Sequence, residues 1–133
     1  MGVGRRDYTW GFLNEAAVEG RYCENYLEYV GVNVDPGSYK VAYSYTVPVG
    51  YRISINKVIV TTTSRYIASL SVYTATRQYV LVYFSDNFVC DFSDKNPIYV
   101  NAGETIYIKC GNWDEIVAVM SCSIIGVKES IIP

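Results

Sequence analysis

The sequence predicts an all-β protein, an antiparallel β-sandwich of about eight strands with a short N-terminal arm or helix. Along most of the chain, apolar residues recur at every second position, as on the buried face of a strand. Turn-forming Gly, Pro, Asn and Asp residues separate these runs at intervals of about 8–12 residues. Half of the 133 residues are hydrophobic and 15% are aromatic, which is enough apolar surface for the core of one domain.

The first 20 residues of the chain differ from the remainder. Residues 1–20 do not alternate, and we expect them to form an arm or a short helix, with residues 21–133 as a single sandwich domain. Residues 21–34 carry apolar side chains at both helical and strand spacing. The β-prone residues 31–34 favour a strand over 26–34.

The middle of the chain alternates most clearly. A turn at residues 35–38 leads into a strand whose larger side chains share one face; they are Tyr39, Val41, Tyr43, Tyr45 and Val47. In residues 51–63 the apolar positions change phase near Asn56 and Lys57, which predicts a β-bulge or a bend. Further strands are expected over 66–75, over 77–84 and around 88–92, with Ala68, Leu70 and Val72 pointing inward in the first of them.

The last third reads as a strand, a turn at 101–104, a strand, a loop and a long final strand. If residues 104–111 and 116–127 pair as a hairpin around Trp113, Cys122 lies about 17–20 Å along the strand from Cys110. That separation argues against a disulfide between them. The final strand is apolar on both faces, which indicates that a neighbouring layer or a second subunit covers it.

Strand number and chain length fit an eight-stranded jelly roll best among the β-sandwiches. An immunoglobulin domain would place a Trp between its two paired Cys residues, but the only tryptophans here are Trp10 and Trp113. Spacing alone leaves the strand order open.

Composition argues against several functions. The chain has no His, so we expect neither the common catalytic triads nor a cofactor, and we expect no enzyme. The net charge of −2 disfavours nucleic-acid binding, and no apolar run is long enough to span a membrane. The polar start of the chain does not resemble a signal peptide. The cysteines lack metal-site spacing and are expected to be buried apolar residues; they are Cys23, Cys90, Cys110 and Cys122.

One loop has the composition of a ligand site. Trp113 stands among Asn112, Asp114 and Glu115, so an aromatic ring adjoins hydrogen-bond acceptors, as in many sugar-binding loops. A lectin-like or receptor-binding role with these four residues is one hypothesis. Because Trp side chains are usually buried, folding of Trp113 back onto the sandwich is favoured over ligand binding.

Three phrases in the sequence resemble single jelly-roll domains of viral structural proteins. They are TVPVGY at 46–51, ISINKVIV at 53–60 and IYVNAGETI at 98–106, and the resemblance covers about residues 38–127. The family comprises capsid, spike and tail-fibre modules of phages and archaeal viruses, and the composition is similar to that of proteins from viruses of hyperthermophiles. The resemblance implies a homo-oligomer within a virion, contacting other virion proteins or a host-surface glycan, without cofactor or catalytic residues.

Overall fold

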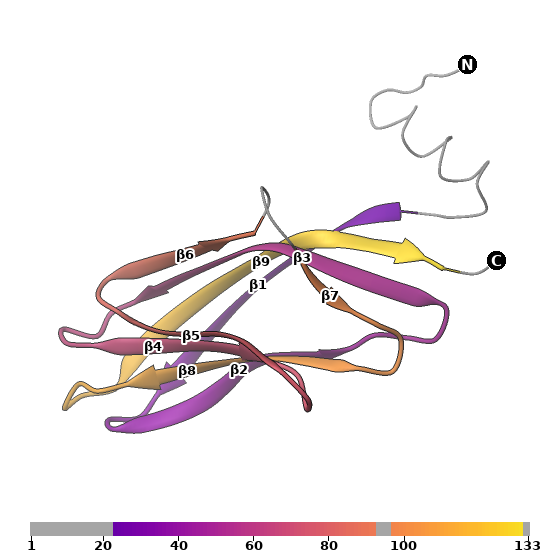
Figure 1. Ribbon diagram of the computed structural model, residues 1–133. Helices are drawn as coiled ribbons and strands as arrows, with labels where there is room; N and C mark the ends of the chain where they lie inside the picture. Colours follow the sequence, from indigo (N-terminus) through magenta and orange to yellow (C-terminus); the bar gives the residue numbers. More distant parts are fainter. Residues whose placement is uncertain (1–22, 93–96, 132–133) are drawn as a thin grey trace, which may run out of the picture.

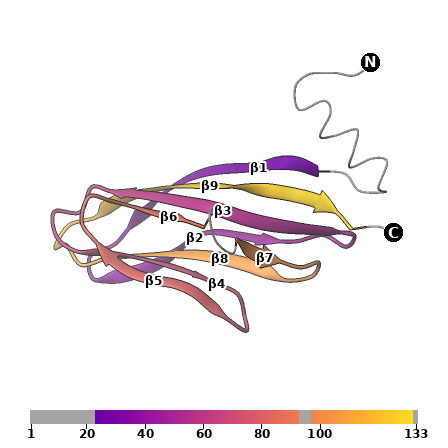
Figure 2. The same cartoon turned by 45° about the horizontal axis from the view of Figure 1, so that its top comes forward.

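Two antiparallel β-sheets pack face to face in the computed structural model, which describes residues 23–92 and 97–131 (Figures 1 and 2). The predicted arm at residues 1–20 lies outside the described residues. The strands are β1 (Cys23–Val34), β2 (Ser38–Thr46), β3 (Tyr51–Thr62), β4 (Ala68–Tyr73), β5 (Gln78–Phe84), β6 (Asn87–Asp91), β7 (Ile98–Val100), β8 (Thr105–Asn112) and β9 (Ala118–Ser130). Residues 23–34 therefore form one strand, which includes the strand expected over 26–34 and begins three residues earlier.

The strand order is that of a jelly roll, which confirms the predicted fold class. Sheet A has the order β1-β9-β3-β6, and β7 also pairs with β3; sheet B has the order β2-β8-β4-β5. One edge of β3 pairs with β9, so β6 and β7 both pair with the other edge. Strand β6 pairs with residues 57–61 of β3, and β7 pairs with residues 53–55. The pair thus fills one strand position, and the nine strands build two four-position sheets.

The core confirms the predicted alternation in β3 and β4. Ile53, Ile55, Val58 and Val60 of β3 are fully buried, as are the inward residues of β4, namely Ala68, Leu70 and Val72. The change of phase in β3 is a bulge, since its register with β9 shifts between Ile55 and Lys57. The sequence therefore placed this irregularity correctly.

Strand β2 corrects one prediction, because its large side chains do not share one face. The register with β8 shifts between Val41 and Tyr43, which is a second bulge. Tyr39 and Val41 are exposed by 53% and 43%, whereas Tyr43 and Tyr45 pack against the core. Tyr fits both environments, since its ring packs while its hydroxyl reaches water, so the sequence pattern did not reveal the bulge.

The expected hairpin of the last two strands is wrong. β8 pairs with β2 and β4 in sheet B, while β9 pairs with β1 and β3 in sheet A (Figure 1). The connection at 113–117 crosses from one sheet to the other. Cys110 and Cys122 consequently face each other across the core with their Sγ atoms 3.7 Å apart, which overturns the predicted separation of these residues.

Candidate ligand site on the aromatic face

The loop that follows β8 is fixed by a buried amide. The Asn112 side chain donates through Nδ2 to the carbonyl oxygens of Val34, at 3.0 Å, and Ile116, at 2.9 Å. Its Oδ1 accepts a hydrogen bond from the backbone N–H of Asp114 at 2.8 Å. Asn112 is completely buried, so this side chain stabilises the crossover between the sheets.

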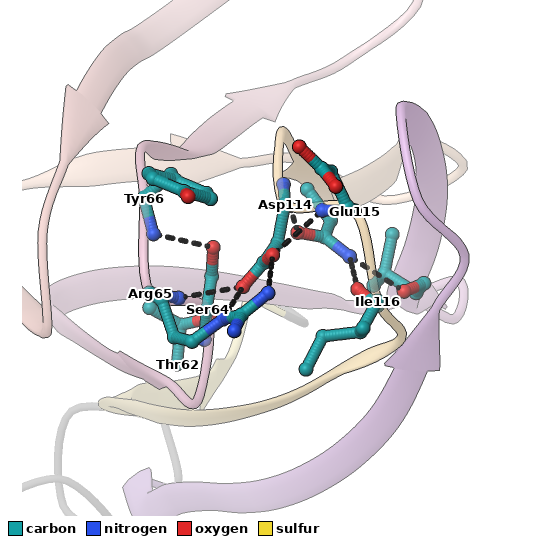
Figure 3. A network of polar contacts seen from close by, with 9 residues as sticks. Thr62, Ser64, Arg65, Tyr66, Asp114, Glu115 and Ile116 are labelled. Atoms are coloured by element: carbon teal, nitrogen blue, oxygen red, sulfur yellow. Dashed lines mark hydrogen bonds and ion pairs between the residues drawn. The ribbon is translucent and has the colours of Figure 1, made fainter.

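Asp114 holds the same loop to the β3–β4 connection (Figure 3). The Arg65 guanidinium donates to its carboxylate from Nη2 at 2.9 Å and from Nε at 3.2 Å, and the Arg65 backbone N–H donates at 2.8 Å. The Asp114 side chain is fully buried, whereas that of Arg65 is 59% exposed. These hydrogen bonds from Arg65 hold the pKa of Asp114 well below its ordinary value of 3.8. Asp114 is thus a buried anion with a matched partner.

Trp113 lies on the outer surface of sheet B, between the two anchored residues. Its ring makes edge-to-face contacts with Tyr39 and Tyr83, at centroid distances of 5.2 and 5.6 Å. A Cβ atom on Gly111 would lie 2.7 Å from Trp113 Cζ3 and 2.4 Å from Ser69 Oγ. Glycine at 111 therefore leaves the room that the indole occupies. The ring folds back onto the sandwich, which is the arrangement favoured from the sequence because Trp side chains are usually buried. Trp113 nevertheless stays 40% exposed.

Other aromatic side chains extend this surface, which we call the aromatic face; its members are Tyr39, Tyr73, Tyr83, Tyr107 and Trp113. Tyr73 and Tyr107 stack at 5.1 Å. The Lys109 ammonium lies 5.2 Å from the ring of Tyr39 and 5.5 Å from that of Tyr73, within cation–π range. Beneath the rings, Ser69 and Ser71 of β4 are almost fully buried. Small residues on the sheet thus support a layer of large rings.

A pocket of about 450 Å³ opens at one end of the aromatic face. Its lining residues are Tyr66, Ile67, Tyr83, Ser85 and Trp113. Of the four residues predicted from the sequence, Trp113 alone lines this pocket. Glu115 is exposed at the surface, while the side chains of Asn112 and Asp114 are buried in the loop's own hydrogen bonds. Ligand binding by these four residues remains a prediction.

Four lining residues were missed from the sequence because they come from other elements. Tyr83 belongs to β5, Ser85 follows it, and the remaining two, Tyr66 and Ile67, precede β4. Residues 79–84 are all apolar, so the sequence did not show on which face of the strand Tyr83 lies. Its proximity to Trp113 depends on the order β8-β4-β5, which spacing did not reveal.

The outer surface of sheet A differs in character, and we call it the aliphatic face; its members are Leu27, Tyr29, Ile59, Val89 and Ile125. Cross-strand pairing places Leu27 opposite Ile125, and Ile59 opposite Val89. Leu27 is 62% exposed and Tyr29 is 71% exposed. Ion pairs between Lys57 and Asp91 and between Arg52 and Glu129 lie on the same surface.

Within residues 23–92 and 97–131, no three His, Cys, Asp or Glu side chains are grouped so that they could hold a metal ion. In the same residues, no helix has the length and apolar character needed to cross a bilayer.

Comparisons with known proteins find only weak structural similarity. No protein-family model matches the chain, and no curated protein matches its sequence. A de novo designed double-stranded β-helix is 12% identical, with a TM-score of 0.36 over 73% of this chain and 97% of that one. The nucleoplasmin-like N-terminal domain of Drosophila FKBP39 is 14% identical, with a TM-score of 0.38 over 80% and 93% of the two chains. A virus-like particle protein of the extra small virus of the prawn Macrobrachium rosenbergii is 12% identical, with a TM-score of 0.30 over 77% and 79%. At these scores the similarities carry no argument about function.

Proposed function

We propose that this protein is a non-enzymatic structural or attachment module of a virion that self-associates through the aliphatic face. The observation that carries the proposal is the exposure of Leu27 and Tyr29, by 62% and 71%, on a sheet surface that also bears Ile59 and Val89. Contiguous exposed apolar residues on a folded domain mark interaction surfaces. Because they are spread over several strands of one sheet, a flat partner fits them best.

A second copy of the chain is the partner that the surface suits. Ion pairs of Lys57 with Asp91 and of Arg52 with Glu129 stand beside the apolar side chains, so the surface combines an apolar centre with charged neighbours. Each copy would present both signs of charge to the other. A two-fold axis through such a patch gives a closed, self-complementary interface, the commonest arrangement in soluble oligomers. Face-to-face packing of two sheets supplies its geometry.

The virion context rests on the sequence resemblance described above together with the jelly-roll strand order. The resembling phrases lie at the β2–β3 turn, along β3 and across the β7–β8 turn. A non-enzymatic role is supported by the lack of His in the sequence and by the use of Asp114 in an internal ion pair with Arg65. The jelly roll by itself hosts many functions, so the surface carries the argument.

Light scattering on matched variants tests the proposal. Leu27→Glu places a charge on the aliphatic face, and we expect it to lower the molar mass of the wild-type oligomer to that of one 15.0 kDa chain. Leu81→Glu is the control, because Leu81 has a similar exposure of 54% but lies on β5, in sheet B. The control should keep the wild-type mass. Equal masses for wild type and both variants would overturn the proposed interface.

A further inference from the structure

We propose that the pocket at the end of the aromatic face binds a pyranose ring of a neutral glycan. The pocket has a volume of about 450 Å³, within the range of natural small-ligand sites. Its place on sheet B separates it from the aliphatic face on sheet A. A ligand can therefore occupy it whether or not the chain self-associates.

The lining side chains match the two kinds of surface on a sugar ring. A pyranose presents a face of C–H groups and a rim of hydroxyls. The rings of Trp113 and Tyr83, 5.6 Å apart and steeply inclined at 72°, offer apolar walls for the C–H face. The hydroxyl groups of Tyr66 and Ser85 both donate and accept hydrogen bonds, as sugar hydroxyls require.

Charge in the surroundings favours a neutral ligand. The five lining side chains are uncharged at neutral pH. Arg65, which adjoins Tyr66, places its guanidinium 5.8 Å from that ring, but the charge is paired with the Asp114 carboxylate at 2.9 Å. An anionic sugar would have to compete with this buried carboxylate for the guanidinium. A neutral hexose avoids that competition.

The pocket is also held in place before any ligand arrives. The Trp113 backbone N–H donates to the carbonyl oxygen of Ile67 at 3.2 Å, which ties together two lining residues. On either side of Trp113, Asn112 and Asp114 are buried and hydrogen-bonded, so they act as positioning residues. A prepositioned aromatic side chain reduces the entropy lost on binding.

A proline-rich peptide is the rival ligand, since aromatic-lined grooves bind that conformation. Such peptides need an extended groove with successive aromatic slots. The pocket here is a single depression whose five lining residues come from three short segments, at 66–67, 83–85 and 113. This shape favours one compact ring over an extended chain.

Tryptophan fluorescence of the full chain tests the inference directly. The chain has two tryptophans, Trp10 and Trp113, so the Trp10→Phe variant reports on the pocket alone. The probes are cellohexaose, chitohexaose and mannohexaose, titrated to about 10 mM, a concentration that detects even weak sites. We expect a saturable change with at least one of them. No change with any of the three would overturn the inference, as would saturation by a decaproline peptide in their place.

Variants then locate the binding. Tyr66→Ala in the Trp10→Phe chain should weaken binding about tenfold, the effect of losing one ring contact and a hydroxyl. Tyr99→Ala is the control, because Tyr99 is 48% exposed, close to the 52% of Tyr66, but lies on β7 in sheet A; it should leave the affinity unchanged. Trp113→Ala, measured by calorimetry with a circular-dichroism check of folding, should abolish binding without changing the oligomeric mass. If folded Tyr66→Ala and Trp113→Ala both kept the affinity of their parent chains, the sugar would bind elsewhere and the inference would be contradicted.

Discussion

Cys110 of sheet B and Cys122 of sheet A meet in the core with their sulfur atoms 3.7 Å apart. This distance fits a hydrogen bond between two thiols and is well beyond the roughly 2.05 Å of a sulfur–sulfur bond, so both cysteines are free. Neither is accessible to solvent. The thiol–thiol hydrogen bond, together with burial, raises the pKa of Cys110 well above its ordinary value. Burial thus shields both thiols from reagents in the folded protein, and their sulfur atoms are neighbours across the two sheets.

Refolding the reduced chain with oxidised glutathione should join these two cysteines. The reaction oxidises both thiols to one disulfide and reduces glutathione disulfide to two glutathione thiols. Because the bond closes a loop between residues 12 apart in the sequence, we expect a gain in unfolding free energy of roughly 3 kcal/mol. Peptide mapping and urea unfolding measure the two effects. The Cys122→Ala variant should gain nothing from the same treatment, and a link from Cys110 to another cysteine would refute the predicted pairing.

Acid should weaken the fold through Asp114. Its pKa is lowered in the folded protein by the hydrogen bonds from Arg65, so the ionised form stabilises the fold above the ordinary value of 3.8. That contribution is lost as the pH falls from 3.8 through the lower folded-state pKa. We expect the urea midpoints of wild type and Asp114→Asn to differ at pH 7 and to converge towards pH 2–3.

Asp91→Asn provides the matched control for this pH dependence. Asp91 forms an ion pair with Lys57 at 3.7 Å, but the two side chains are 49% and 35% exposed. Because exposed ion pairs contribute little to stability, this variant should follow the wild-type midpoint at each pH. If Asp114→Asn showed the same profile as Asp91→Asn, the ion pair between Asp114 and Arg65 would not govern acid stability.

Gly126 should tolerate no side chain. Opposite the bulge of β3, a Cβ atom at this position would lie 2.0 Å from the Ser54 carbonyl oxygen, and backbone cannot move aside without breaking the sheet. We expect Gly126→Ala to lower the unfolding free energy by roughly 3 kcal/mol, as for severe overpacking. The control is Gly31→Ala on the neighbouring strand β1, where the nearest atom is 4.0 Å away. Thermal unfolding of both variants decides the matter, and similar melting temperatures would contradict this account.

The fold was largely predictable because apolar and polar residues alternate in the sequence wherever one face of a strand is buried. The phase change near Asn56 located the β3 bulge, since Ile53 and Ile55 before it and Val58 and Val60 after it all face the core. The β2 bulge was hidden, because Tyr39 and Tyr43 suit either face. Pairing of β8 with β9 was assumed because consecutive strands usually pair, but the loop carrying Asn112 and Asp114 connects the two sheets instead.

The candidate site was only partly predictable, for a related reason. Trp113 was identified because polar residues stand on both sides of it in the sequence. The side chains of Asn112 and Asp114, however, form hydrogen bonds with other residues of the protein. Whether a polar side chain faces a ligand or its own backbone depends on tertiary contacts that local sequence does not record. Tyr66 and Tyr83 reach the pocket only through the order of the strands in sheet B.

Self-association of the wild-type chain is the central claim, and sedimentation equilibrium measures it most directly. At tens of micromolar the account predicts the mass of two or more chains, a whole-number multiple of 15.0 kDa. Reducing agent should not change this mass, because Cys110 and Cys122 are buried in the core and lie outside the proposed interface. A mass of 15.0 kDa across that concentration range would contradict the account.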